Sequence, residues 1–161
     1  PLRGMRNLEW LGLQWNQVSD LDPLRETSLE YTTLNGNNIS DLSPLSGLAT
    51  LQWLYIDNNP IDDLSPLQDM TGLTHLGLRA MYDRFGMECL SDITPLEHLP
   101  NLIWVRLDYN IIRDLTALVN NLGLGSGDEV YLTGNPLDFS SHSQNMQDIR
   151  TLQERGVIVH Y

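Results

Sequence analysis

Apolar residues recur along this chain at a fixed spacing, and the same pattern is written six times. The first copy consists of Leu8, Leu11, Leu13, Asn16, Val18 and Leu21. Copies with this spacing also begin at Leu29, Leu51 and Leu102, and a shortened copy begins at Val130. The remaining copy begins at Leu73 and rejoins the pattern after an insertion. A period of about twenty residues is typical of a solenoid, in which each repeat buries its apolar face only against its neighbours.

Each copy predicts a short strand on one side of the solenoid and a tight turn on the other. Around the paired leucines, apolar and variable residues alternate, which is the period of a half-buried strand. Stacked copies would place these strands in one parallel sheet, about 4.8 Å apart. An Asp followed by a Leu/Ile-x-Pro-Leu turn then predicts short helical turns on the convex side, because Asp is a good N-cap and Pro suits a first turn. The predicted N-caps are Asp20, Asp41, Asp63, Asp92 and Asp114.

Two polar columns in this pattern have structural explanations. The repeat asparagine follows each strand, where the chain turns inward and backbone groups lose their partners. An Asn side chain both donates and accepts, so we expect it to satisfy backbone groups in adjoining turns. The five carboxylates of the Asp column are spread over five turns, whereas the ligands of calcium loops lie close together. We therefore predict no metal site.

The motifs Ile39–Leu45 and Ile61–Leu67, which read I-S-D-L-S-P-L and I-D-D-L-S-P-L, resemble the leucine-rich repeats of bacterial internalins, with about 22 residues per repeat. The resemblance covers nearly the whole chain, and the stretch from Gly127 to Tyr161 resembles the closing segment of bacterial members. It implies an α/β repeat solenoid: a right-handed leucine-rich repeat arc with a parallel concave sheet and a convex side of short 3-10 helices or turns. It also implies binding of another protein through the concave face, since internalin-like proteins use that face for host receptors.

The two ends of the chain differ. Residues 1–137 hold about six repeats, and residues 138–161 are predicted to form a helix-strand cap that covers the last open core face. A capping box at Ser141 and Gln144 would start the cap helix, and Val157–Val159 would form a final strand. At the other end, Leu2, Met5 and Leu8 would face solvent unless further N-terminal repeats or a partner cover them. We also find no basic-then-apolar leader, and expect a processed or excised piece of a longer protein.

Candidate binding residues lie in the strand positions that flank the buried leucines and point out of the concave face. The first such column is Trp10, Tyr31, Trp53, His75, Trp104 and Glu129; the second is Gly12, Thr33, Tyr55, Gly77, Arg106 and Tyr131; the third is Gln14, Asn35, Asp57, Arg79, Asp108 and Thr133. Exposed Trp and Tyr with Arg beside them are typical of binding hot spots. Stacked aromatic residues also stabilise a parallel sheet, so a purely structural ladder is the alternative. The predicted concave-face binding residues are Trp10, Tyr31, Trp53, Tyr55, His75, Arg79, Trp104, Arg106, Asp108 and Tyr131.

The insertion at residues 81–87 is the second candidate site, because insertions in repeats map to loops on one face, often the binding face. Tyr82, Arg84 and Phe85 would project beside the aromatic column. Alternatively, Phe85 and Met87 fold back to fill a gap in the core. The neighbouring Cys89 is the only cysteine and is expected to be a buried, inert thiol.

Composition excludes several classes of function. A net charge of −12 disfavours nucleic acid and anionic membrane surfaces as partners, and no apolar run approaches the roughly 18 residues of a membrane span. All nine basic residues are arginine, so lysine chemistry is excluded. There is no catalytic triad in motif context, no phosphate loop followed by lysine, and no paired His or Cys at metal-ligand spacing. We predict neither catalysis nor a cofactor.

Three hypotheses remain open for the function of this macromolecule-binding module. We favour recognition of a protein by a bacterial surface or secreted module, although a cytoplasmic location is not excluded. A glycan could instead stack on the Trp and Tyr rings, with Asp57, Asp108, Asn35 and Gln14 supplying hydroxyl contacts. In the third, the chain is an assembly subunit that self-associates through its uncapped N-terminal end.

Overall fold

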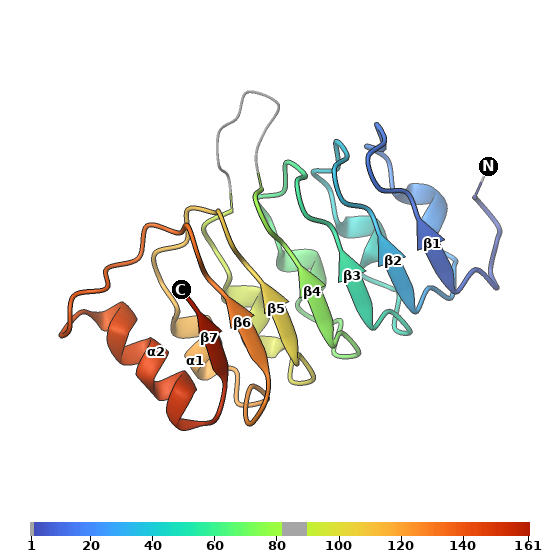
Figure 1. The fold of residues 1–161 in the computed structure, drawn as a ribbon. Helices are drawn as coiled ribbons and strands as arrows, with labels where there is room; N and C mark the ends of the chain where they lie inside the picture. Colours follow the sequence, from blue (N-terminus) through green and yellow to red (C-terminus); the bar gives the residue numbers. More distant parts are fainter. Residues whose placement is uncertain (1, 82–89) are drawn as a thin grey trace.

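The computed structural model describes residues 2–81 and 90–161, and these residues form a solenoid with a seven-stranded parallel sheet along its concave side (Figure 1). The strand order in the sheet is the order in the sequence. The strands are β1 Trp10–Gly12, β2 Tyr31–Thr33, β3 Trp53–Tyr55, β4 His75–Gly77, β5 Trp104–Arg106, β6 Glu129–Tyr131 and β7 Ile158–His160. The solenoid and its parallel sheet, predicted from the repeat period, are therefore confirmed.

Each three-residue strand has an inward middle residue and two outward residues, as alternation requires, and the middle residue is buried in every strand except β1, where Leu11 is partly buried. Leu54 in β3 and Val105 in β5 are fully buried, and the register aligns each middle residue with the next one along the sheet. The remaining repeat leucines fill the space between the sheet and the convex turns and form one continuous core. This stacking fixes which side chains can reach the concave surface.

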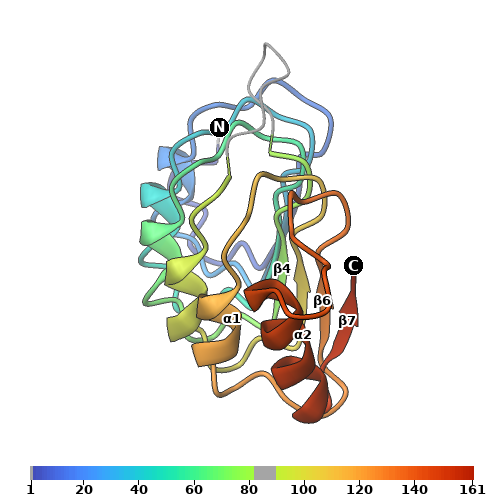
Figure 2. The same cartoon turned by 90° about the vertical axis from the view of Figure 1, so that its left-hand side faces the viewer.

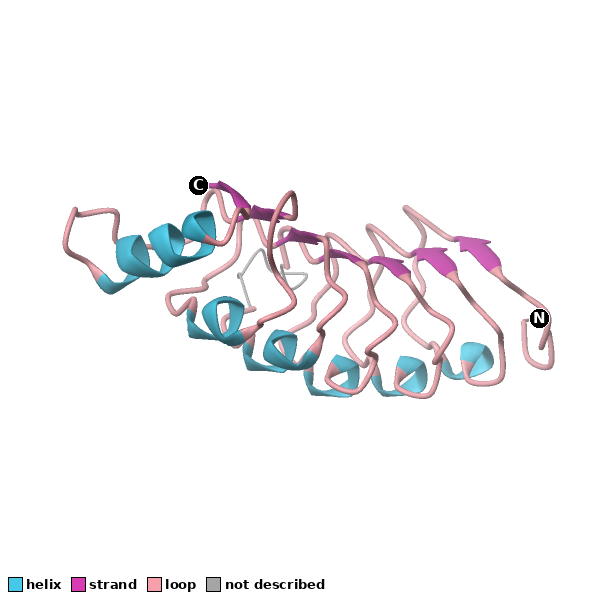
Figure 3. Cartoon of the chain, turned by 90° about the horizontal axis from the view of Figure 1, so that it is seen from below, coloured by secondary structure: helices cyan, strands magenta, loops and turns pink. Residues whose placement is uncertain are grey.

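Short helices line the convex side, opposite the sheet (Figures 2 and 3). They are the 3-10 helices η1 Asp22–Leu24, η2 Ser43–Leu45, η3 Ser65–Leu67 and η4 Thr94–His98, and the α-helix α1 Thr116–Asn120. Each 3-10 helix has a proline in its first two positions, as predicted for a helix start.

The predicted role of the Asp column was wrong by one position. The N-cap residues are the apolar residues that follow each Asp, and none of them makes a side-chain cap. Each Asp carboxylate instead accepts the backbone N–H two residues on, at 2.8–2.9 Å. This is an Asx turn, which satisfies the first N–H of the helix from outside the cap. The same bond, with the hydroxyl of the next Ser or Thr, lowers the pKa of Asp41 and Asp92.

The repeat asparagines connect neighbouring turns, as predicted. The Asn59 amide donates to the Leu34 oxygen of the preceding turn at 3.0 Å and to Ile56 of its own turn at 2.9 Å, while its oxygen accepts the Ile39 N–H at 3.0 Å. Asn37, Asn110 and Asn135 likewise donate to a carbonyl of the preceding turn and to one of their own turn, and accept an N–H from the preceding turn. Asn16 lies in the first turn and donates only within its own turn.

The position just before each repeat asparagine, or before Met81 in the fourth turn, has a backbone feature that the sequence did not predict. Trp15, Gly36, Asn58, Ala80, Tyr109 and Gly134 all have positive φ, between 54° and 79°. The first five donate their N–H to a carbonyl of the next turn at 2.7–2.9 Å. The ladder of backbone bonds thus continues beyond the strands and holds the chain in this left-handed conformation.

The two ends of the solenoid differ in how the core is covered. Helix α2, Gln144–Glu154, packs Ile149 and Leu152 into the core and leads into β7, which pairs with β6. Its N-cap is Ser143, whose hydroxyl accepts the Met146 N–H, so the predicted capping box at Ser141 was wrong by two residues. At the other end an apolar hollow opens between Leu2, Leu13, Val18, Leu21, Pro23 and Leu24.

Candidate functional site

The concave face carries a continuous array of aromatic rings that extends from β1 to β7. Its members, called the ring array below, are Trp10, Tyr31, Trp53, Tyr55, His75, Trp104, Tyr131 and His160. They meet because parallel pairing in register places the same repeat position of successive strands side by side. Seven of the eight rings were predicted to lie together.

The rings contact one another in the geometries that aromatic pairs prefer. Trp10 and Tyr31 are stacked with centroids 4.9 Å apart. Tyr31 and Trp53 meet edge to face at 5.5 Å, and Trp53 meets His75 in the same way at 5.1 Å. Trp104 contacts Tyr55, with ring centroids 5.6 Å apart. Trp10 remains 61% exposed, whereas the rings inside the array are half-buried by their neighbours.

His160 is the member that sequence analysis missed. The final strand was placed one residue too early, at Val157–Val159, which left His160 outside it. In the structure His160 pairs with Tyr131, and their rings stack at 4.1 Å with 10° between their planes. Val157 and Val159 are buried and Ile158 is exposed, but all three are apolar, so the sequence has no alternation that would have placed this ring.

Glu129 forms hydrogen bonds with the last two rings of the array, Tyr131 and His160. The Tyr131 hydroxyl donates to Glu129 Oε2 at 2.5 Å, and His160 Nε2 lies 3.1 Å from the same oxygen. These hydrogen bonds lower the pKa of the Glu129 carboxyl, the bond from Tyr131 contributing most. The same bond raises the pKa of Tyr131. The face therefore ends on a carboxylate whose Oε2 already takes part in two hydrogen bonds.

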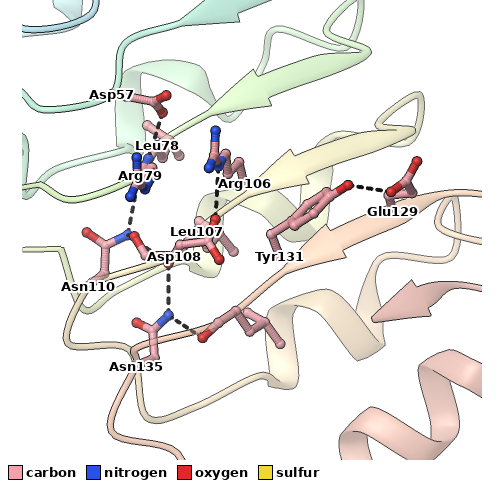
Figure 4. A network of polar contacts seen from close by, with 11 residues as sticks. Asp57, Leu78, Arg79, Arg106, Leu107, Asp108, Asn110, Glu129, Tyr131 and Asn135 are labelled. Atoms are coloured by element: carbon pink, nitrogen blue, oxygen red, sulfur yellow. Dashed lines mark hydrogen bonds and ion pairs between the residues drawn. The ribbon is translucent and has the colours of Figure 1, made fainter. Parts of the chain in front are cut away.

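The predicted charged residues lie where β3, β4 and β5 end (Figure 4). Arg106 Nε donates to Asp108 Oδ2 at 3.0 Å, and Asp108 is only 5% exposed. The backbone N–H of Arg79 donates to Asp57 Oδ1 at 2.8 Å. Burial raises the pKa of Asp57, with this bond and the guanidinium groups of Arg106 and Arg79 acting in the opposite direction. Of these four residues, Arg106 and Asp108 form an ion pair, whereas Arg79 bonds Asp57 through its backbone N–H.

Two further rings stand at the edge of the face, in the left-handed positions. Trp15 is 75% exposed and its ring lies over Gly36, where an added Cβ would come 2.2 Å from a ring carbon. Tyr109 lies over Gly134 in the same way. The guanidinium carbon of Arg79 sits 4.9 Å from the Tyr109 ring centroid, which is a cation–π contact. Both glycines therefore leave room for a ring from the preceding turn.

The second candidate site falls outside the described residues. Tyr82, Arg84 and Phe85 all belong to the segment that the structure does not describe, as does Cys89. Met81, at the start of the predicted insertion, is fully buried and occupies the repeat position held by asparagine in the other turns. The binding role of the insertion remains a prediction.

The buried leucine positions, the parallel concave sheet and the convex 3-10 helices define a leucine-rich repeat protein. Three solved structures resemble it over most of its length. An internalin of Listeria monocytogenes, InlF, superposes with a TM-score of 0.75 at 27% identity, and covers 96% of this chain and 41% of its own. Internalin C2 of the same species gives a TM-score of 0.67 at 37% identity, over 84% of this chain and 54% of its own.

A leucine-rich repeat protein of Leptospira interrogans shares the fold, with a TM-score of 0.70 at 18% identity, over 97% of this chain and 43% of its own. The chain is a leucine-rich repeat protein of the internalin-like class, and it spans about half the length, or less, of these three proteins. No family model and no curated protein matches it. Among the described residues, no helix is long and apolar enough to cross a membrane.

Proposed function

We propose that this chain is a non-catalytic module that recognises another protein through the ring array of its concave face. The observation that carries the proposal is the continuity of the array across all seven strands. Trp10, Tyr31, Trp53, Tyr55 and Trp104 are the proposed anchors, because large rigid rings bury much area at a small entropic cost. His75 and Tyr131 complete the contact surface.

Stability of the sheet alone does not explain the array. Ring contacts of this kind contribute about 0.5–1.5 kcal/mol each beyond area burial, but the buried leucines between the rings already hold the strands together. Trp10, at 61% exposure, and Trp15, at 75%, leave most of their surface in solvent. Exposed apolar surface of this kind marks interaction sites in soluble proteins.

The remaining parts of the proposal follow from the resemblance to internalins and from the repeat pattern. We place the protein outside the bacterial cell, secreted or at its surface. Residues 1–137 supply the repeats and residues 138–161 supply the cap. Tyr82, Arg84 and Phe85 of the insertion are proposed as secondary contacts. Arg106 is an anchor only for a partner that replaces its bond to Asp108.

The test compares the wild-type chain with the double variant Trp53→Ala/Trp104→Ala as immobilised baits for solubilised cell-surface proteins. We expect a protein that the wild type retains and the double variant loses. Leu122→Ala is the matched control, because Leu122 is an apolar side chain that is 87% exposed and follows α1 on the convex side. Circular dichroism of each variant verifies that it is folded.

Each other outcome has a defined meaning. Equal retention by the wild type and the double variant contradicts the proposal that the ring array binds. Retention that disappears when the extract is treated with periodate identifies a glycan as the ligand. Light scattering of the free chain over a tenfold range of concentration shows whether its partner is a second copy of itself.

A further inference from the structure

Negative charge predominates around the ring array. Its two arginines both contact groups of the face: Arg106 is paired with Asp108, and the guanidinium of Arg79 lies against the Tyr109 ring. The charge of Arg106 is therefore offset by Asp108, and the guanidinium of Arg79 is directed at the Tyr109 ring. A partner with acidic side chains would have to break these pairings to gain an attractive contact.

Carboxylates outnumber these cations around the array. Asp57, Asp108 and Glu129 lie on the face, and Glu9 and Glu30 stand exposed at the starts of β1 and β2. Each of the last two immediately precedes one ring of the stacked pair Trp10 and Tyr31 in the sequence. No ion pair to Glu9 or Glu30 is formed by residues 2–81 and 90–161. The face is thus negative before any partner arrives, as is the whole chain at −12.

We propose that the ring array docks a basic polypeptide segment, whose Arg or Lys side chains lie over the exposed Trp and Tyr rings. This inference rests on the proposed function and adds the chemistry of the partner. A cation over the face of a Trp or Tyr ring is attracted by the ring quadrupole. The stems of Arg and Lys are apolar and cover the rings while their charged heads stay in water near the carboxylates.

The negative electrostatic potential of the face also raises the association rate of a basic segment relative to a neutral or an acidic one. Charges on both sides steer diffusional encounter, so the association rate rises and falls with ionic strength. Acidic segments are repelled by the same field. The ring array supplies the contact area, and the charge selects which segments reach it.

The experiment is an unbiased selection of 12-residue peptides displayed on phage, with the wild-type chain as bait. Peptides that also bind Trp53→Ala/Trp104→Ala are removed, so that only binders of the ring array remain. We expect Arg and Lys to be enriched in this set and Asp and Glu to be depleted. A ring-dependent set without basic enrichment overturns this inference and leaves the proposed function standing. If no ring-dependent peptide is recovered, the proposed function fails with it.

Charge variants then test the mechanism on one selected basic peptide. Glu9→Gln/Glu30→Gln removes two charges beside the rings, and Asp62→Asn/Asp69→Asn removes two that flank η3 on the convex side. We expect the first variant to weaken binding about three- to tenfold, mostly through a slower association rate, and the second to change it less than about twofold. Equal losses in the two variants would mean that only the net charge matters, and would overturn docking over the rings.

Discussion

The repeat asparagines offer a direct test of what holds neighbouring turns together. Asn59 is completely buried, and its side chain is the hydrogen-bond partner of the Ile39 N–H and the Ile56 carbonyl. In Asn59→Ala these two backbone groups stay buried and lose that partner. A buried donor or acceptor left without a partner costs about 1–3 kcal/mol, so we expect a loss of about 2–6 kcal/mol in the free energy of unfolding.

Asn16 provides the matched control, because it holds the same repeat position at the exposed first turn. It donates only to Leu13 and Gln14, and water can replace it there. We therefore expect Asn16→Ala to cost less than about 0.5 kcal/mol. Urea unfolding followed by tryptophan fluorescence measures both variants, with the slope of the transition compared to verify that each unfolds in one step. Equal losses for the two asparagines would refute the reasoning, since it attributes the cost to burial and not to residue type.

Three further predictions concern other positions of the solenoid. Leu54→Ala should lose about 2–5 kcal/mol in urea unfolding because Leu54 is fully buried; a loss below about 1 kcal/mol would mean that the core refills the space. Gly36→Ala should cost about 1–2 kcal/mol and shift the fluorescence of Trp15, since Gly36 has φ of +67° beneath that ring, whereas Gly47→Ala, with open space around it, should be neutral or stabilising. Burial lowers the pKa of His75, so the unfolded chain takes up a proton more readily and His75 should make the protein less stable as pH falls through its ordinary value of 6.5. Unfolding at pH 7.5 and 5.5 should show a larger loss for the wild type than for His75→Gln, and an equal loss would contradict this.

The sequence predicts what depends on the repeat, because the same physical requirement recurs in every turn. Leu54 must be buried wherever a strand crosses the core, and Asn59 must bridge two turns wherever the chain bends inward. The concave position of Trp53 follows from its place beside Leu54 in a strand of period two. Seven of the eight rings were therefore predicted to lie together from spacing alone.

What the sequence did not predict depends on local geometry that residue type does not reveal. The left-handed position is occupied by residues as different as Trp15, Gly36 and Ala80, since inter-turn backbone bonds hold it whatever the side chain. Asp is a residue type that caps helices. Whether an Asp acts as the N-cap or forms an Asx turn depends on its position relative to the helix start, and the two positions differ by one residue. His160 was missed for a similar reason, because a shift of one residue in a strand moves every side chain to the other face.

Under the proposed function, stability and recognition rest on separate positions of each strand, and that separation determines how far the concave face can change. Within β3, Leu54 packs into the core while Trp53 and Tyr55 on either side contact rings of neighbouring strands. Outward positions can vary without disturbing the core, as Gly12 and Gly77 do in the second column. The rings nevertheless continue across these gaps, because first-column rings such as Trp10 and His75 contact the next strand directly. The core leaves these outward positions free to vary, yet the array is continuous across them, as selection for a ligand would produce. Loss of folding in Trp53→Ala would show instead that the rings belong to the core.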